Sequence, residues 1–458
     1  MARVSIFLII VALISGTVGC ASPPLAQYDL TISSTEGGSV IDPGEGTFGY
    51  DEVTVVNLVA EPDEGYQFAN WTGDVTTIGN VNAAMTIITT DDSYEIRANF
   101  ALESLEIRDW YDLDAVRNNL GGSYILMNDL DSVTAGYEEL AGSTANGGKG
   151  WQPIAGRDDP FIGSFDGQTH EIRNLLIKRS GEDWVGLFGC IGKGGTIENV
   201  RLENVVMVGH SCVGGIAGQV YGGTVKSCRS AGSVAGDSDV GGVVGVNSLG
   251  GTMQDTYSTC SVSGHHAVGG LVGATHTATV SNSYSTGSVT GESAVGGLVG
   301  LNLGTVSDSY SAGSVAGSVA VGGLIGQHYY NSIVTNCYSS GSVAGYQRTG
   351  GLVGYNQGGT ITKCYSVAGV TGDSSVGGLV GFSEPPDATS SFWDAESSGC
   401  AESDGGTAKT TSEMRDILTF SRQSWDIVAV AHGETNRDYI WSIVNGVSYP
   451  FLSWQSVS

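Results

Sequence analysis

The chain has 458 residues, enough for two or three domains, and carries 47 Asp and Glu against 19 Lys and Arg, a formal net charge of −28. This excess of negative charge makes nucleic acid and anionic membrane surfaces poor partners, because acidic side chains repel phosphate groups. The 71 Gly residues would suggest disorder if they were scattered. They recur at fixed positions between short apolar runs, so an ordered chain is expected.

The first 20 residues have the features of an export signal. Arg3 supplies a positive charge, residues 6–14 are mostly apolar, and small residues lead up to Cys20. Residues 17–20 resemble the lipobox of bacterial lipoproteins, which implies that Cys20 carries a lipid and becomes the mature N-terminus. We therefore expect an exported protein, lipid-anchored at the cell surface or at the outer face of a membrane, with residues 21–27 as a tether. An ordinary secretory signal and an uncleaved anchor are the alternatives.

Residues 28–101 are expected to form a small, separate β domain. Five segments alternate apolar and polar side chains, as half-buried strands do: 28–34, 53–60, 66–71, 85–90 and 94–100. The run from Val56 to Asp74 resembles the divergent internalin-type B-repeat, a module of bacterial surface proteins, which implies a spacer or an adhesive unit. Within it we expect Trp71 to be a core residue rather than a platform for a ligand.

The middle of the chain repeats itself. A hexapeptide of the type V-G-G-L-V-G recurs every 26 to 28 residues, with a looser copy at Val185, and begins at Val213, Val240, Val268, Val295, Val321, Thr349 and Val376. A fixed period indicates a solenoid, and short β-branched runs bounded by Gly indicate strands rather than helices. We expect an all-β chain whose residues 102–390 form a right-handed parallel β-helix of about ten coils.

Both ends of this β-helix are expected to be capped, because bare strand edges invite aggregation. An amphipathic helix over residues 112–120 would cover the first coil. Residues 391–458 would seal the far end, with a helix that begins at the capping box of Thr410 and Glu413 and short strands at 439–444 and 447–454.

The order of the motifs also indicates a family. From Phe161 the chain reads F-x-G-x-F-D-G-x-x-H-x-I-x-N-L, followed by the hexapeptides, each with C-Y-S or a variant and then G-x-V-x-G. This series, over residues 151–382, resembles the GLUG-repeat family. The resemblance implies a β-helix found on bacterial surfaces, in adhesin-like proteins and beside IgA-cleaving metallopeptidases, and it supplies no defined catalytic residues.

One aligned position shows which way the repeats face. Arg201 and Arg229 occupy it in the first copies, and a buried Arg would be very costly, so the position faces outward and the preceding one inward. The same position then forms an exposed ladder of rings about 4.8 Å apart: Tyr257, Tyr284, Tyr310, Tyr338 and Tyr365. These rings either stabilise the coils by stacking or form a stripe that binds glycans.

A second aligned position holds Asn247, Asn302 and Asn356, with His328 in the copy between the last two. We expect it to be a structural Asn ladder at a turn.

The sequence offers little catalytic or metal chemistry. His170-Glu171 begins like a zinc-protease motif, but Asn174 stands where a second His is needed. The carboxylate pairs Asp129–Asp131 and Asp237–Asp239 could bind calcium weakly, although neither has the EF-hand spacing. No other cofactor is expected. Cys337 and Cys364, one coil apart, are expected to be buried free thiols, because the spacing between coils is slightly long for a disulfide.

The function that these features favour is a surface adhesin or binding scaffold, for a glycan or for a surface protein. An enzyme that cleaves polysaccharides is an alternative, because β-helices host such enzymes and because Arg157, Asp158, Asp159, Asp166, His170 and Glu171 lie close together in the sequence. A purely structural spacer is the third possibility.

Overall fold

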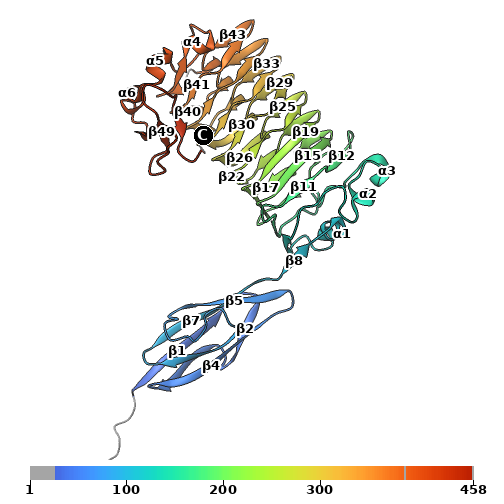
Figure 1. Cartoon of the computed structure of the whole chain (residues 1–458), viewed down its shortest axis with the longest axis vertical. Helices are drawn as coiled ribbons and strands as arrows, with labels where there is room; N and C mark the ends of the chain where they lie inside the picture. Colours follow the sequence, from blue (N-terminus) through green and yellow to red (C-terminus); the bar gives the residue numbers. More distant parts are fainter. Residues whose placement is uncertain (1–25, 386–387, 456–458) are drawn as a thin grey trace, which may run out of the picture. The chain divides into compact units, whose positions relative to one another are not determined.

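The computed structural model describes residues 26–385 and 388–455, and the chain divides after Glu103 into two compact units (Figure 1). Strands hold 51% of the residues and helices about 7%, which confirms the all-β prediction. None of the described helices is long and apolar enough to cross a membrane. The export signal, Cys20 and most of the predicted tether lie outside the described residues.

The first unit is a small β sandwich. One sheet has the strand order β3-β1-β7-β5 and the other β2-β4-β6. The strands are β1 (Gln27–Ser34), β2 (Gly38–Asp42), β3 (Gly46–Asp51), β4 (Thr54–Pro62), β5 (Tyr66–Gly73), β6 (Met85–Thr90) and β7 (Tyr94–Leu102). All five predicted strands are present. The sequence did not reveal β2 and β3, which contain Gly and are short, features that weaken a strand pattern.

The core of this domain lies between the two sheets. Leu30, Leu58 and Ile88 are fully buried, and Trp71 is almost so. The indole Nε1 of Trp71 donates a hydrogen bond to the Ala83 carbonyl oxygen at 3.0 Å, so the one polar atom of this side chain is satisfied. Trp71 is therefore a core residue, as predicted.

Each regular coil of the second unit repeats one series of strands. In the coil at Val268 these are β25 (His266–Gly269), β26 (Val272–Ser281), β27 (Tyr284–Ser285) and β28 (Val289–Thr290). Each strand pairs in parallel with its equivalent in the next coil, as Val268 does with Val295. Their inward side chains join one continuous apolar core. Parallel pairing at one fixed period confirms the β-solenoid.

The other solenoid strands fall into three columns. The column of the hexapeptides contains, besides β25, β16 (Ser211–Val213), β20 (Ser238–Gly241), β29 (Ser293–Gly296), β33 (Val319–Gly322), β38 (Gln347–Gly350) and β43 (Ser374–Gly377). The column that includes β26 contains β10 (Ser164–Asp166), β13 (Phe188–Ile191), β14 (Thr196–Glu198), β17 (Ala217–Tyr221), β18 (Thr224–Lys226), β21 (Val244–Ser248), β22 (Thr252–Gln254), β30 (Val299–Ser307), β34 (Ile325–Tyr329), β35 (Ile333–Thr335), β39 (Val353–Gln357), β40 (Thr360–Thr362), β44 (Val380–Ser383) and β45 (Ala388–Thr389). The column of β27 and β28 contains β11 (Glu171–Arg173), β12 (Leu176–Lys178), β15 (Arg201–Val208), β19 (Arg229–Ala235), β23 (Tyr257–Ser258), β24 (Ser261–Ser263), β31 (Tyr310–Ser311), β32 (Ser314–Ala316), β36 (Tyr338–Ser339), β37 (Ser342–Ala344), β41 (Tyr365–Ser366), β42 (Gly369–Thr371), β46 (Phe392–Asp394) and β47 (Thr407–Lys409).

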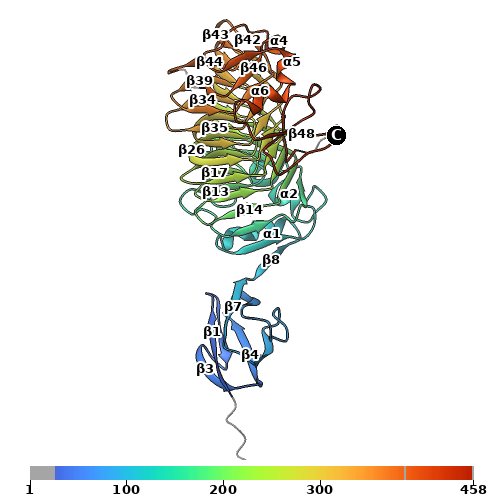
Figure 2. The same cartoon turned by 90° about the vertical axis from the view of Figure 1, so that its left-hand side faces the viewer.

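The solenoid has about eight turns, fewer than the ten or so expected. Figure 2 shows strands such as β17, β26, β34 and β39 one above another along its side. The prediction had counted the irregular segment before Val185 as full coils. That segment instead forms short strands and two helical turns of four residues each, α2 (Tyr137–Leu140) and α3 (Ala145–Gly148).

The Gly residues of the hexapeptide permit the sharp turn between β29 and β30. A Cβ on Gly296 would collide with the carbonyl oxygen of Val299 and would lie 2.7 Å from the amide nitrogen of Gly326, in the next coil. Backbone atoms cannot rotate away as a side chain can. The repeat therefore needs Gly at this position in every coil.

The predicted N-terminal cap is present. Strand β8 (Ser104–Ile107) pairs with β9 (Ser123–Leu126), and between them lie α1 (Trp110–Ala115) and the 3₁₀ turn η1 (Val116–Asn118). The Asp109 side chain caps α1 by accepting a hydrogen bond from the amide of Asp112. Trp110 and Leu113 are buried in the solenoid core, so the helix covers the first coil.

Besides β46 and β47, the described part of residues 391–458 contains three short helices and three further strands. These are α4 (Ala395–Ser398), α5 (Thr411–Met414), α6 (Ile417–Ser421), β48 (Ile427–Ala429), β49 (Trp441–Ile443) and β50 (Phe451–Leu452). The predicted capping box of Thr410 and Glu413 is present. The helix ends earlier than expected, because Asp416 caps a second helix by accepting from the amide of Leu418.

Candidate functional site on the tyrosine face

The five predicted tyrosines form a stacked ladder. Neighbouring ring centroids lie 4.7, 4.9, 4.9 and 5.0 Å apart along the series Tyr257, Tyr284, Tyr310, Tyr338 and Tyr365, with interplanar angles of 3° to 4°. The residues just before them, such as Thr256, Ser283 and Cys337, are fully buried. The inferred orientation of this strand is therefore confirmed.

The prediction that all five rings are exposed is wrong for two of them. Tyr338 is 9% exposed and Tyr365 is 1% exposed, because the C-terminal segment folds along the side of the solenoid. The Tyr365 hydroxyl donates to the Pro450 carbonyl oxygen, and Gln455 Nε2 donates to the Tyr338 hydroxyl oxygen at 2.8 Å. This segment was expected only to seal the end. Its apolar side chains instead bury half of the ladder.

Three rings of the ladder stay partly exposed, and Trp454 borders them. The Trp454 ring lies 6.2 Å from that of Tyr284 and 6.0 Å from that of Tyr310, tilted by about 30°. Its Nε1 donates to the Asp308 carbonyl oxygen at 3.0 Å, which fixes the ring. We call Tyr257, Tyr284, Tyr310 and Trp454 the open aromatic surface. The sequence did not place Trp454 here, although the many Trp in residues 391–458 were a usable signal.

A pocket of about 420 Å³, which combines apolar surface with several polar side chains, includes Trp454 in its lining. Its lining combines turns of the solenoid with the C-terminal segment: Asn282, Asp308, Asn336, Asp426, Arg437, Asp438, Tyr439, Ile440, Ser453 and Trp454. Asn282, Asp308 and Asn336 occupy the same turn in successive coils, with φ of 48°, 49° and 52°. Asn and Asp tolerate this left-handed conformation better than most residues. The same turn therefore brings amide and carboxylate groups to the pocket.

Burial changes the acidity of the ladder. Desolvation is the main cause that raises the pKa of Tyr284 to about 12; the neighbouring Tyr310 and Tyr257 also raise it, and Arg229 lowers it by less. Desolvation also raises the pKa of Tyr310. Tyr284 and Tyr310 are therefore neutral phenols at physiological pH. Because the rings are stacked on one another, they present uncharged ring edges and hydroxyl groups rather than free faces.

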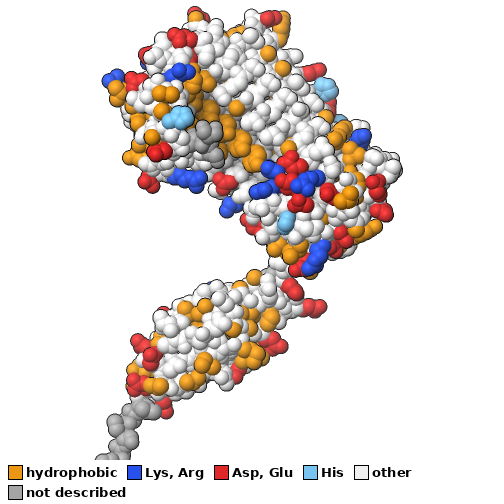
Figure 3. Space-filling model, viewed as in Figure 1, with side chains coloured by type: hydrophobic (Ala, Val, Ile, Leu, Met, Phe, Trp, Pro, Cys, Tyr) orange, Lys and Arg blue, Asp and Glu red, His pale blue; other side chains and the backbone are white. Residues whose placement is uncertain are grey.

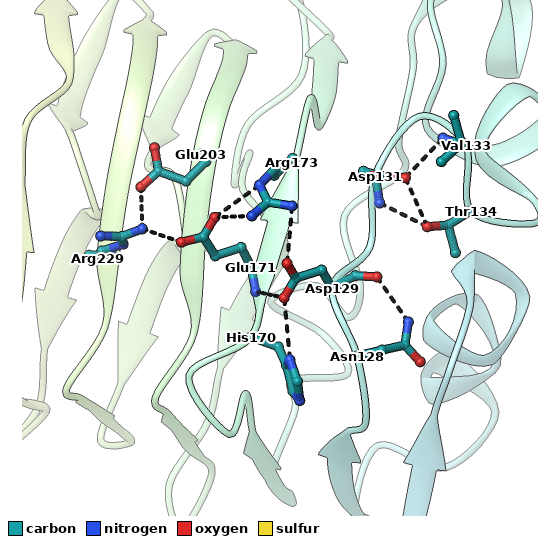
Figure 4. A network of polar contacts seen from close by, with 10 residues as sticks. All are labelled: Asn128, Asp129, Asp131, Val133, Thr134, His170, Glu171, Arg173, Glu203 and Arg229. Atoms are coloured by element: carbon teal, nitrogen blue, oxygen red, sulfur yellow. Dashed lines mark hydrogen bonds and ion pairs between the residues drawn. The ribbon is translucent and has the colours of Figure 1, made fainter.

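Charged residues continue the same column toward the N-terminus (Figure 4). Strand pairing aligns Glu171 with Arg201, Arg201 with Arg229, and Arg229 with Tyr257. Arg229 Nη2 lies 2.6 Å from carboxylate oxygens of both Glu171 and Glu203. Figure 3 shows these red and blue side chains gathered on the first coils.

A second group of ion pairs extends this network. Arg173 lies 2.6 Å from Glu171 and 3.0 Å from Asp129, and His170 Nδ1 lies 3.2 Å from Asp129. The backbone amide of Glu171 lowers the pKa of Asp129, and His170 and Arg173 add to this effect. Glu171 and Asp129 thus have partners within the protein, which favours a structural role for the network.

Two other residues considered for catalysis, Asp166 and Arg157, make contacts of a structural kind. Asp166 accepts hydrogen bonds from the Gln168 amide at 2.8 Å and from Asn199 Nδ2 at 2.9 Å, as a turn residue does. The Arg157 guanidinium lies over the Trp184 ring, 5.9 Å from its centroid. The described contacts give these residues local structural partners.

The carboxylates considered for calcium also have partners. Asp131 accepts from the Val133 amide at 2.9 Å, and Asp237 lies 2.6 Å from His265 Nδ1. Burial raises the pKa of Asp239. Among residues 26–385 and 388–455, no group of three or more His, Cys, Asp or Glu is placed to hold a metal ion.

The thiols of Cys337 and Cys364 are free and fully buried. The Cys337 amide donates to the Cys364 sulfur at 3.4 Å, and desolvation raises the pKa of Cys337 well above its usual value. The prediction of buried free thiols is therefore confirmed.

The comparisons with known families agree with both resemblances. Residues 28–104 match the divergent InlB B-repeat domain, and residues 264–290, 317–344 and 345–371 match the GLUG motif. The chain carries a B-repeat domain and GLUG repeats. The tyrosines from Tyr284 to Tyr365 thus lie within or between GLUG motifs.

The curated relatives match over a small part of their own length. Halomucin of Haloquadratum walsbyi is 40% identical over 133 residues, which is 28% of this chain and 1% of halomucin. A putative Gly-rich membrane protein of Evansella cellulosilytica is 34% identical over 114 residues, 24% of this chain and 12% of that protein. The chain therefore spans a small part of the relatives it matches.

Two solved structures are similar at low identity. A putative immunoglobulin A1 protease from Bacteroides ovatus has a TM-score of 0.45 and 18% identity, covering 77% of this chain and 93% of that one. An IgA1 protease has a TM-score of 0.35 and 15% identity, covering 79% and 27%. Both likenesses are too weak to bear on activity.

Proposed function

We propose that this protein is displayed outside the cell and binds glycan chains along the open aromatic surface. The observation that carries the proposal is the partly exposed, parallel stack of Tyr257, Tyr284 and Tyr310 beside Trp454 and its pocket. The Trp454 ring, which stands outside the stack, and the edges of the stacked tyrosine rings offer apolar surface to sugar rings, and amide and carboxylate groups bond sugar hydroxyls. Such a site combines one apolar platform with a few oriented polar groups.

The class of glycan follows from charge. The chain has a net charge of −28, and the pocket is lined by Asp308, Asp426 and Asp438 against one Arg437. Acidic polysaccharides would be repelled by these carboxylates. We therefore expect neutral glycans to bind more tightly than uronate-containing or sulfated ones.

Display at the surface is supported by the export signal, with lipid attachment at Cys20 as the anchor to a membrane. The printed names of the relatives, halomucin and a Gly-rich membrane protein, agree with such a location. In this arrangement the B-repeat domain lies between the anchor and the solenoid along the chain. The solenoid would act as a stable scaffold that presents its outer face to a partner.

Glycan binding can be tested with the chain that begins at Cys20, screened on an array of neutral and acidic glycans. For the tightest ligand, Trp454→Ala and Tyr284→Ser should each weaken binding at least tenfold, because each removes part of the aromatic platform. Tyr346→Ser is the matched control, since Tyr346 is 64% exposed but lies on another face. Unchanged affinity in both test variants would rule out this site.

The same preparation separates the competing functions. Release of new reducing ends from the bound glycan would identify an enzyme rather than an adhesin. A wild-type chain that melts normally but binds no glycan on the array would favour the spacer. In that second case, the tyrosine ladder would be a purely structural stack.

A further inference from the structure

The two outer faces of the N-terminal sandwich differ in polarity. On the β3-β1-β7-β5 sheet the outward residues include Thr31, Ser33, Glu95 and Arg97. This is the pattern expected of a sheet with one face in water. The outer face of the β2-β4-β6 sheet breaks that pattern and carries large apolar side chains. Its exposed fractions are 55% for Ile41, 58% for Val55, 74% for Met85 and 43% for Ile87.

These side chains form one continuous surface, which we call the apolar face: Ile41, Val55, Val59, Met85 and Ile87. Strand pairing places Val59 directly opposite Met85, and Asn57 opposite Ile87. A groove of about 490 Å³ runs between them, lined by Asp42, Asn57, Leu58, Val59, Met85, Thr86 and Ile87. The face is therefore hollowed as well as apolar.

The fold of the domain does not require this surface. Its core is complete on the inner side of the same sheet, where Val56, Leu58 and Ile88 are buried. Exposed apolar area is unfavourable in water, and a contiguous patch of it marks an interaction site. Next to the patch, Val53 is held at a φ of 62°. This conformation is an outlier for a β-branched residue.

Charge restricts the partner. Residues 26–103 contain 14 Asp and Glu but a single basic residue, Arg97, and Figure 3 shows red acidic side chains but no blue basic ones on the visible side of this domain. Asp42 lines the groove, and Glu61 is exposed at the end of β4. An anionic lipid surface or a second copy of the domain would bring like charges together.

We propose that the apolar face is a docking surface for a protein segment with an apolar centre and basic ends. The apolar centre lies in the groove between β4 and β6, and the Lys or Arg side chains of the partner lie against Asp42 and Glu61. This interaction is independent of glycan binding, because it uses a different unit of the chain.

The test uses the full chain from Cys20 and three dye-labelled peptides in a fluorescence anisotropy assay. The first peptide is Lys-Lys-Leu-Val-Leu-Val-Leu-Lys-Lys, the second has Glu in place of Lys, and the third has a Ser-Thr centre. The first should bind at least tenfold more tightly than either of the others. Raising the salt concentration should weaken the binding of the first peptide, because screening reduces the attraction between charges.

Two sets of variants locate the site. Met85→Ser combined with Ile87→Thr should weaken binding of the first peptide at least tenfold. The control, Val133→Thr with Val447→Thr, removes two exposed Val side chains from the other unit and should change nothing. Thermal melts of each variant establish that it is folded.

Three results would overturn the proposal. Equal binding of the basic and acidic peptides would show that the face binds apolar chains whatever their charge. A dimer that dissociates in the Met85→Ser/Ile87→Thr variant, seen by light scattering, would assign the face to a second copy. Absence of binding by the first peptide to the folded chain would remove the proposed partner class.

Discussion

His328 should make the stability of the solenoid depend on pH. Its ring is fully buried, and desolvation lowers its pKa from the usual 6.5 to about 4 despite the Thr360 carbonyl group. Its contacts suit a neutral ring, with Nε2 as donor to the Thr360 carbonyl oxygen at 3.3 Å. Nδ1 then accepts from Asn302 Nδ2 at 3.1 Å, and Ser332 Oγ, which donates to the Tyr329 carbonyl oxygen, lies 2.9 Å from the same Nδ1.

Proton binding by His328 determines whether the folded chain gains or loses stability as the pH falls. Between pH 6.5 and about 4 the unfolded chain protonates His328 and the folded chain does not, so lowering the pH favours unfolding. The stability is complete above pH 6.5 and is lost as the pH falls through this window. At about 1.4 kcal/mol for each pKa unit, the loss in the free energy of unfolding is about 3 kcal/mol.

His328→Asn removes the protonation of His328 and places in the same position a side chain that the neighbouring coils already carry there. Asn302 and Asn356 occupy the equivalent position in the neighbouring coils, and the Asn356 side chain bonds both the amide and the carbonyl oxygen of Gly359 at 3.0 and 3.1 Å. Urea unfolding of the wild type and the variant is measured at pH 7 and pH 4. Carboxylates titrate in both chains, so the difference between their pH dependences reports His328.

We expect the wild type to lose about 3 kcal/mol more than His328→Asn over this range. His432→Asn is the control, because His432 is exposed, and it should behave as the wild type. If the wild type and His328→Asn lose stability in parallel, the buried neutral ring is not a feature of the folded chain in solution.

Three other outcomes follow from the structure. Gly296→Ala should cost about 3 kcal/mol or more in chemical denaturation, because the new methyl group meets backbone atoms, whereas Gly156→Ala, which has open space around it, should stay within about 0.5 kcal/mol. Equal effects of the two would contradict the steric argument. Cys20→Ser should move the protein from the membrane fraction to the soluble exported fraction. An unchanged distribution would argue against lipid attachment there. Cys337 and Cys364 should resist a thiol reagent in the native state and react after denaturation, because both are buried with no exposed surface. Reaction of the native protein would show that these coils open.

The repetitive part of the chain was predictable because the pattern of apolar and polar residues within one repeat also determines how neighbouring repeats pack. A residue that faces inward in one coil faces inward in every coil, so the alignment of Arg201 with Tyr257 was enough to orient the strand. The same reasoning identified the ladder spacing, the buried thiols and the Asn position that includes His328. The coil number was overestimated where the repeat is irregular, before Val185.

The open aromatic surface was only half predictable. Sequence periodicity gave the positions of the five tyrosines, but it carries no information about a non-repeating segment that folds back on them. Tyr338 and Tyr365 are covered by residues that follow them by many positions, up to Pro450 for Tyr365. Contacts at such separations depend on where the chain turns after the last coil.

The sequence by itself determined the β-solenoid, the direction in which its repeats face and the presence of a separate B-repeat domain. The first two features follow from periodic burial, because every repeat carries the same order of apolar and polar side chains. Only the tertiary structure decided which tyrosines stay accessible, that Trp454 borders them, and that one outer face of the N-terminal sandwich is apolar. Those features arise from the packing of non-repeating segments, where no period relates the residues that meet.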